Sequence, residues 1–368
     1  MPSSAGSPRF ERLPADPSPV HYDLSYSWVS LKDTTEFEGT VDIALNFTTD
    51  SYATAASTLL RLNSLNLHIT TAKLCDSTKK PRECSRISLM APNQEVQLEF
   101  PGPTPHGHAT LTIDFRGRLN EQLAGFYKSK TSDGKIMGVT QFEATDARRA
   151  FPCWDEPARK ATFRLKMTTP PEAVVLSNTR PKSKTTRTGK WPSGEAREGV
   201  TWEFYPTPKM STYLLAWVVL PAAHDFDSLS AISPIPPHVE TVVYVPKGKL
   251  NQAVFACSVG VKALDYFAEL FDLAYPLPLM QHIGCPDFAA GAMENFGCIT
   301  YREARLIVDP ATTTSAAKRD VARVVCHEVS IGFNFTHRLW RMTNPFTIMF
   351  SSPINGSGTA LRWVRLFY

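Results

Sequence analysis

The chain of 368 residues lacks long apolar runs and any cysteine pattern that would organise a disulfide framework. Its longest apolar stretch, residues 213–223, is too short to span a bilayer and is typical of a buried strand. The seven cysteines are an odd number, lie far apart and include no CxxC pair, which favours reduced thiols. Residues 1–19 contain no apolar segment of the kind that a signal peptide needs. These absences predict a cytoplasmic protein that does not bind a membrane.

An excess of charge of one sign is also missing from most of the chain. The net charge is +4, yet residues 329–368 contain four arginines and no lysine, aspartate or glutamate. The other 35 basic residues are therefore matched by all 35 acidic ones in residues 1–328. A neutral main body of this kind argues against a nucleic-acid partner.

Short stretches of alternating apolar and polar residues occur between residues 20 and 245. They lie at 41–47, 96–100, 111–115, 201–204 and 241–245. Such stretches, separated by turn signals, predict packed antiparallel sheets. We therefore expect a flexible leader at 1–19 and a mainly β domain at 20–235, ending where prolines cluster between Ser230 and Glu240. The polar segment 181–199 predicts an exposed hairpin or loop.

The residues after 236 have a mixed α+β pattern. Apolar residues at helical spacing predict a helix over 250–271, which Pro276 and Pro278 follow. A strand is expected at 297–301 and a second helix at 312–328. Residues 329–368 are rich in aromatic residues but keep neither period, so we expect a disordered tail there.

Two short motifs suggest chemistry. The first is Gly291-Ala292-Met293-Glu294-Asn295, and the second is His327-Glu328. In an HExxH helix the two histidines lie four residues apart on one face and bind the same Zn²⁺. Position 331, where the second histidine would stand, is Ile331, whose side chain cannot coordinate a metal.

Together with the segment TQFEATDARRAFPCWDEP at 140–157, these motifs resemble the zinc aminopeptidases of the gluzincin class, most closely the puromycin-sensitive type. The resemblance runs from about Leu13 to Glu328. It implies a mainly β N-terminal domain of packed antiparallel sheets at 20–235. It also implies that residues 236–328 form the incomplete α+β start of a thermolysin-like catalytic domain, and that residues 329–368 lie outside the family.

The resemblance also implies a zinc cofactor and roles for individual residues. The substrate would be a peptide with a free N-terminus, because two carboxylates, Glu294 and Glu143, would hold its α-amine. The backbone of the glycine and alanine of the first motif would pair with the peptide as an added strand. The implied substrate-binding set is Glu143, Gly291, Ala292, Met293, Glu294 and Asn295. His327 would be the first zinc ligand and Glu328 the general base.

The zinc site implied by the resemblance is incomplete in this sequence. A catalytic zinc needs three protein ligands and one open position. The second ligand is replaced by Ile331, and no acidic residue that could be the third follows Glu328. His337 lies about 280° around a helix from His327 and faces away from it. We therefore expect an inactive member of a zinc aminopeptidase family, one whose chain does not hold zinc.

Alternative interpretations remain at this point. The chain could be a non-catalytic peptide-binding remnant or scaffold, or the product of a mis-spliced transcript, since Val329-Ser330 is what the intron start GTAAGT encodes. An epoxide-hydrolysing relative of the same class is a third option. Glu143 could instead pair with the neighbouring Arg148 and Arg149, while Asp155 and Glu156 are expected to form structural salt bridges.

Overall fold

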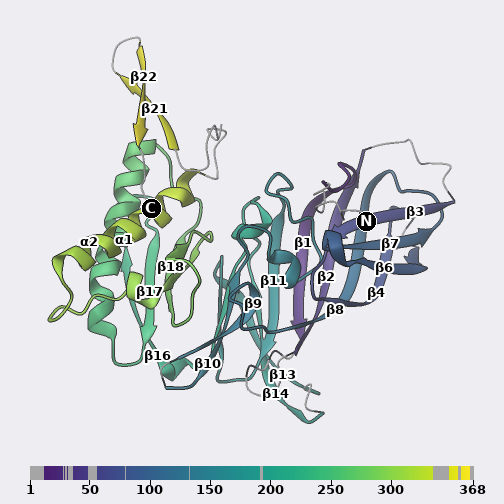
Figure 1. Ribbon diagram of the computed structural model, residues 1–368, viewed down its shortest axis with the longest axis horizontal. Helices are drawn as coiled ribbons and strands as arrows, with labels where there is room; N and C mark the ends of the chain where they lie inside the picture. Colours follow the sequence, from purple (N-terminus) through teal and green to yellow (C-terminus); the bar gives the residue numbers. More distant parts are fainter. Residues whose placement is uncertain are drawn as a thin grey trace, which may run out of the picture.

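The computed structural model describes residues 12–27, 29, 31, 36–48, 56–78, 80–131, 133–190, 194–334, 348–354 and 358–364 (Figure 1). Residues 1–11 of the expected leader and His337 lie outside the described residues. Sheets make up the N-terminal part, on the right of Figure 1, and two helices cover a further sheet on the left. The fold class predicted from the sequence is confirmed.

Among the described residues, neither helix has the length and apolar character needed to cross a bilayer. All seven cysteines lie in described segments and are free thiols.

Buried and exposed side chains alternate along the strands of the N-terminal sheets. In β2 (Glu36–Phe47), for example, Val41, Ile43 and Leu45 are fully buried while the residues between them are partly exposed. All pairs of the largest sheet are antiparallel except β1 with β11. The eight strands of this sheet, in spatial order, are β13 (Pro181–Lys190), β14 (Ala196–Phe204), β11 (Thr162–Thr169), β1 (Ser18–Ser27), β2, β8 (Gly107–Arg118), β4 (His68–Cys75) and β5 (Pro81–Glu83).

Two smaller sheets complete the N-terminal part. The first has the order β12 (Val174–Ser177), β15 (Trp217–Leu220), β10 (Ile136–Gln141) and β9 (Gly125–Lys130). The second has the order β3 (Ser57–Asn63), β7 (Glu95–Pro101) and β6 (Arg86–Met90). The predicted strand segments fall within β2, β7, β8, β14 and, further on, β17. The predicted exposed hairpin is the pair β13–β14, and the apolar run at 213–223 contains the buried strand β15.

A mixed five-stranded sheet forms the second part. Its order is β16 (Phe226–Ile232), β17 (Glu240–Pro246), β18 (Leu279–Cys285), β20 (Cys298–Arg302) and β19 (Ala292–Met293). The helix α1 (Leu250–Phe271) has the predicted bounds and packs against β16 and β17. Since β16 pairs with β17, this sheet begins at Phe226, upstream of the boundary expected at 235.

The second helix extends further than predicted. α2 (Ser315–Asn334) begins after Thr314, whose hydroxyl accepts a hydrogen bond from the backbone N–H of Ala317. It continues past 328 because Val329 and Phe333 prolong the buried stripe begun by Val321 and Val325, four residues apart along the helix. The start of the predicted tail is therefore helical at 329–334.

Further along, the strands β21 (Ile348–Ile354) and β22 (Gly358–Val364) pair antiparallel. Residues 348–354 and 358–364 thus form strands. From the sequence we expected disorder there, because neither a helical nor a strand period persists in this part of the chain.

Buried hydrogen bonds join the N-terminal part to the five-stranded sheet. The amide of Asn178 donates to the carbonyl oxygens of Leu214 and Phe296, both at 2.8 Å, and accepts from the N–H of Ala216 at 2.9 Å. The amide of Gln281 donates to the carbonyl oxygen of Ser177 at 2.8 Å. Such fully buried amides are costly to leave unpaired, so these bonds fix the two parts against each other.

A glycine makes this junction possible. Gly297 has φ +66°, and a Cβ built on it would lie 2.2 Å from the carbonyl oxygen of Asn178. Only glycine fits, because both the backbone angle and the close approach exclude a side chain.

We predict that Gly297→Ala lowers the free energy of unfolding by at least about 3 kcal/mol, since it adds a backbone clash to left-handed strain. Gly248 is the matched control, because it has φ +83° and a Cβ built on it would meet nothing within 4 Å. Gly248→Ala should cost only about 1 kcal/mol. Urea unfolding of both variants measures the difference, and equal losses would contradict the clash.

Candidate functional site

The motif at 291–295 lies at an open sheet edge. Among the described strands, β19 is the last of the five-stranded sheet and pairs only with β20. The carbonyl oxygen of Gly291 accepts a hydrogen bond from the N–H of Arg302 at 3.0 Å. Because hydrogen-bonded and non-bonded residue pairs alternate in an antiparallel ladder, the N–H and C=O of Ala292 point away from β20. Neither group is therefore used in the pairing with β20.

Space is available beside this edge. A Cβ built on Gly291 would meet no atom within 4 Å. By contrast, Met293 and Asn295 are turned inward and are buried. The sulfur of Met293 receives a hydrogen bond from Gln141 at 3.5 Å, and the amide of Asn295 donates to the hydroxyl of Thr300 at 3.3 Å. Their side chains therefore hold the edge strand in place rather than offering polar atoms to a ligand.

Glu294 follows the edge strand and lies near Glu143, which comes two residues after β10. Burial, with the charge of Glu143 as a second cause, raises the pKa of Glu294 to about 7. Partial shielding from water raises the pKa of the exposed Glu143 as well. The two predicted amine-binding carboxylates are thus brought together, although they come from different parts of the fold.

The neighbouring arginines do not neutralise this pair. Arg148 is bound to Asp155, with 3.0 Å between Nε and Oδ2, and each of these two side chains is only 2% exposed. Arg149 pairs with Asp146. Among the described residues, neither Glu143 nor Glu294 has an ion-pair partner. The predicted salt bridge of Asp155 is confirmed, and the alternative that Arg148 and Arg149 bind Glu143 is not what the structure contains.

Glu156, the other predicted salt-bridge former, instead accepts a hydrogen bond from the backbone N–H of Leu13 at 3.0 Å. Its carboxylate therefore ties the start of the described chain to the N-terminal sheets and takes no part in the site.

α2 adds a third carboxylate. Glu328 is 4% exposed, and burial together with the charges of Glu294 and Glu143 raises its pKa well above the usual value. Its Oε2 atom is buried without a hydrogen-bond partner among the described residues. Three acidic side chains from three separate segments therefore face one region.

Tyr213 lies in the same region as the three carboxylates, although no motif in the sequence contains it. It lies in a 3₁₀ turn, Thr212–Leu214, and burial followed by the charges of Glu294 and Glu143 raises the pKa of its hydroxyl. In the sequence it was one residue of an apolar run, and nothing in that run distinguished it. Only the folded chain brings its hydroxyl beside the carboxylates.

The residues present do not fit a catalytic zinc ion. α2 is helical through Ile331, so the side chain at 331 follows His327 by one turn on the same face. The backbone of the second ligand is therefore in place, but its side chain is a hydrocarbon. No group of three or more His, Cys, Asp or Glu side chains in the described segments is arranged to hold a metal. The single imidazole of His327 is the only predicted ligand on α2.

Comparison with known proteins identifies two matching domain families. The family described as the Peptidase M1 N-terminal domain matches residues 18–214, and the Peptidase family M1 domain matches residues 255–337. The second match continues past Glu328, further than the resemblance that we recognised from the motifs.

Individual relatives give the same result. The chain is 38% identical to Aminopeptidase M1-C of Oryza sativa subsp. japonica over 322 residues, which is 87% of this chain and 34% of that relative. It is 36% identical to the puromycin-sensitive aminopeptidase of Caenorhabditis elegans and to endoplasmic reticulum aminopeptidase 2 of Homo sapiens, covering 88% and 87% of this chain and 32% of each relative. The chain thus spans about a third of the length of these curated relatives.

The raised pKa of Glu294 predicts a pH-dependent cost in stability. Its folded pKa is about 7, so between about pH 4.5 and pH 7 the unfolded state releases a proton that the folded state keeps. Stability from this group is therefore lost as pH rises through that range. Glu294→Gln should raise the free energy of unfolding by about 1–3 kcal/mol at pH 8 and leave it unchanged at pH 4.5.

Urea unfolding at the two pH values checks this, with Glu172→Gln, an exposed acid outside the site, as control. A gain of equal size at both pH values would show that charge at Glu294 is not its cause.

Proposed function

The chain belongs to peptidase family M1, and on that premise we propose that it binds the free N-terminus of peptides without hydrolysing them. The family activity implied by the relatives is the removal of N-terminal residues by a zinc aminopeptidase. We assign to this chain the recognition part of that activity. The observation that carries the proposal is the pair Glu143 and Glu294 beside an open strand edge, with no cation described next to either carboxylate.

The site suits an α-ammonium group for electrostatic reasons. Burial, with the charge of Glu143 as a second cause, raises the pKa of Glu294, and an ammonium ion between the two carboxylates would offset the charge of both. Charge-assisted hydrogen bonds from the ammonium would then lower the pKa of Glu294 from about 7. A peptide whose amine is blocked offers neither the charge nor the donors, which accounts for selectivity for chain ends.

The strand edge provides the second contact. The outward N–H and C=O of Ala292 would pair with the backbone of an extended peptide, and Gly291 leaves room for the close approach. Backbone pairing of this kind is independent of side-chain identity, so it fixes the direction of the peptide while the carboxylates select its terminus. Burial raises the pKa of Tyr213, so its hydroxyl remains protonated at neutral pH beside the carboxylates.

We further propose that the protein acts in the cytoplasm, in peptide catabolism. Its seven free thiols support this, since the reducing cytosol keeps thiols from forming disulfides.

We predict that a short peptide with a free amine binds saturably, and that its N-acetylated form binds at least ~100-fold more weakly. Glu294→Gln should weaken binding of the free peptide at least ~10-fold, because it removes one partner of a charge-assisted bond. Glu143→Gln should have a smaller effect, since Glu143 is exposed. Fluorescence anisotropy of a C-terminally labelled peptide measures the effect of acetylation and of each of the two substitutions on the dissociation constant. Glu172→Gln is the control. Equal affinity for the acetylated peptide would refute the proposal.

The side chains at positions 327 and 331 also predict that the purified chain holds little zinc. After dialysis, the purified chain should contain far less than one zinc per molecule, as measured by atomic emission. Ile331→His restores the second imidazole on the face of His327 and should raise the affinity for zinc by at least ~10-fold, whereas Ile331→Val should not change it. A full equivalent of zinc in the unaltered chain would show that ligands other than these two positions form a site.

A further inference from the structure

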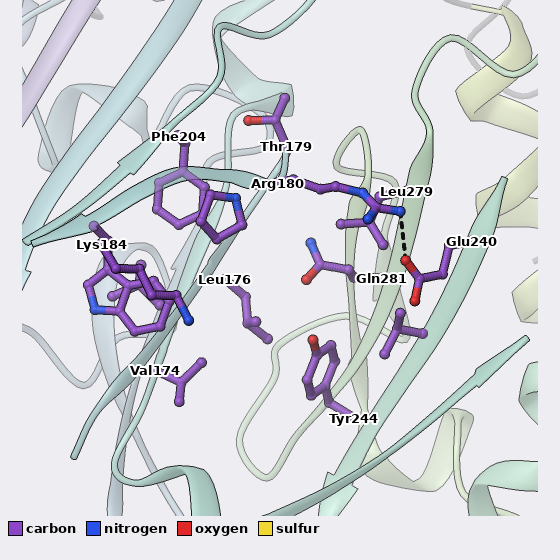
Figure 2. A pocket seen from close by; sticks show the side chains of 14 residues that line it. Val174, Leu176, Thr179, Arg180, Lys184, Phe204, Glu240, Tyr244, Leu279 and Gln281 are labelled. Atoms are coloured by element: carbon purple, nitrogen blue, oxygen red, sulfur yellow. Dashed lines mark hydrogen bonds and ion pairs between the residues drawn. The ribbon is translucent and has the colours of Figure 1, made fainter. Parts of the chain in front are cut away.

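A cavity of ≈ 210 Å³ lies where the N-terminal part meets the five-stranded sheet, apart from the candidate site described above (Figure 2). One wall comes from β12, β13 and β14, and the other from β17 and β18. None of its lining residues belongs to the strand edge or the carboxylate cluster described above. It is larger than a ~150 Å³ apolar cavity that holds benzene and smaller than the ~300–1,000 Å³ pockets of drug-sized ligands. A ligand of a few to about ten heavy atoms matches this space.

Apolar side chains form one part of the lining of this cavity. Figure 2 shows Leu176 and Phe204 on one side and Tyr244 and Leu279 on the other. Trp202 also lines the cavity, and the ammonium group of Lys184 lies 4.1 Å from its ring centroid. An aliphatic or aromatic side chain would lose contact with water against these apolar residues.

Two fixed polar groups face the apolar interior. Gln281 is 4% exposed, and its amide nitrogen donates to the carbonyl oxygens of Ser177 and Gly297 at 2.8 and 3.1 Å. Both amide hydrogens are thereby used, which fixes the orientation of the group. Its Oε1 atom has no partner among the described residues and is available to accept a hydrogen bond. The hydroxyl of Tyr244 has no described partner either, and burial raises its pKa to about 12, so it remains a donor.

One basic and one acidic side chain lie at the entrance of the cavity. Arg180, from the N-terminal part, donates one hydrogen bond of 2.6 Å to Oε2 of Glu240 on β17 (Figure 2). The two side chains are 49% and 30% exposed, so the pair is open to solvent. Only one bond joins them, which leaves other N–H groups of the guanidinium and Oε1 of the carboxylate for a ligand.

This arrangement selects among ligand charges. A simple anion would be attracted by Arg180 and repelled by Glu240, and a simple cation would meet the reverse. A ligand that carries both charges a bond or two apart satisfies both side chains at once. An α-amino acid has that head group, and only the free amino acid does, because in a peptide the two charges are at opposite ends.

We propose that this cavity binds a free α-amino acid with an apolar side chain. Its carboxylate contacts Arg180, its ammonium contacts Glu240, and its side chain packs against Leu176 and Val242. Because Arg180 and Leu176 come from the N-terminal part while Glu240 and Val242 come from the five-stranded sheet, the ligand joins the two. This inference does not depend on the proposed peptide binding, since the two sites share no residue.

Isothermal titration of the full chain with leucine, N-acetylleucine and leucinamide tests the proposal. In the Glu294→Gln variant, whose amine site at the strand edge is weakened, leucine should bind saturably with one site, and each analogue, which lacks one of the two charges, should bind at least ~10-fold more weakly. Leucine should also raise the unfolding temperature, because it bridges the two parts. Absence of saturable leucine binding at millimolar concentration, or equal binding of N-acetylleucine, would overturn the proposal.

Variants locate the binding. Arg180→Gln and Tyr244→Phe should each weaken leucine binding, the first at least ~10-fold and the second severalfold. Arg305→Gln, which removes an exposed arginine paired with Asp320 outside the cavity, should not change it. Glu294→Gln should also leave it unchanged. Loss of leucine binding in Glu294→Gln, with retention in Arg180→Gln, would place the amino acid at the strand edge and refute the cavity site.

Discussion

The burial of the Glu294 carboxylate close to Glu143 is the constraint on which the candidate site depends. Burial first, and the charge of Glu143 second, raise the cost of ionising Glu294, and no ion-pair partner among the described residues offsets it. The fold nevertheless holds them together, because the loop after β19 is attached to the N-terminal part through the buried amide of Asn178 and through Gly297. Under the proposed function, a charged ligand would recover the stability that these carboxylates cost.

The proposed separation of peptide binding from hydrolysis rests on missing zinc ligands, and Ile331 occupies the position of one of them on α2. α2 continues without interruption through Ile331, and the backbone there has the same helical form that an HExxH motif requires. The difference is therefore chemical and not conformational. Since the amine site and the strand edge are formed by other segments, an incomplete metal site leaves them intact. Under the proposed function, recognition of a peptide terminus does not require the ligand set for zinc.

Much of the fold follows from local pattern, while the site depends on contacts that local pattern does not contain. The helix at 250–271 was predicted with its bounds because apolar spacing and two following prolines define it. The end of α2 was misjudged, since the stripe formed by Val329 and Phe333 is visible only with the aromatic residues Phe267, Phe271 and Tyr275 that cover it. The partner of Arg148 was likewise unpredictable, because Asp155 and Glu143 are both near it in sequence.

The most direct test of the account is the affinity of a free-amine peptide measured by calorimetry in excess EDTA and again in saturating zinc. If amine recognition rests on Glu143 and Glu294 alone, the two dissociation constants should agree within about twofold. Binding that appears only when zinc is present would contradict the account, since it would mean that a metal held by this chain, and not the carboxylate pair, creates the peptide site.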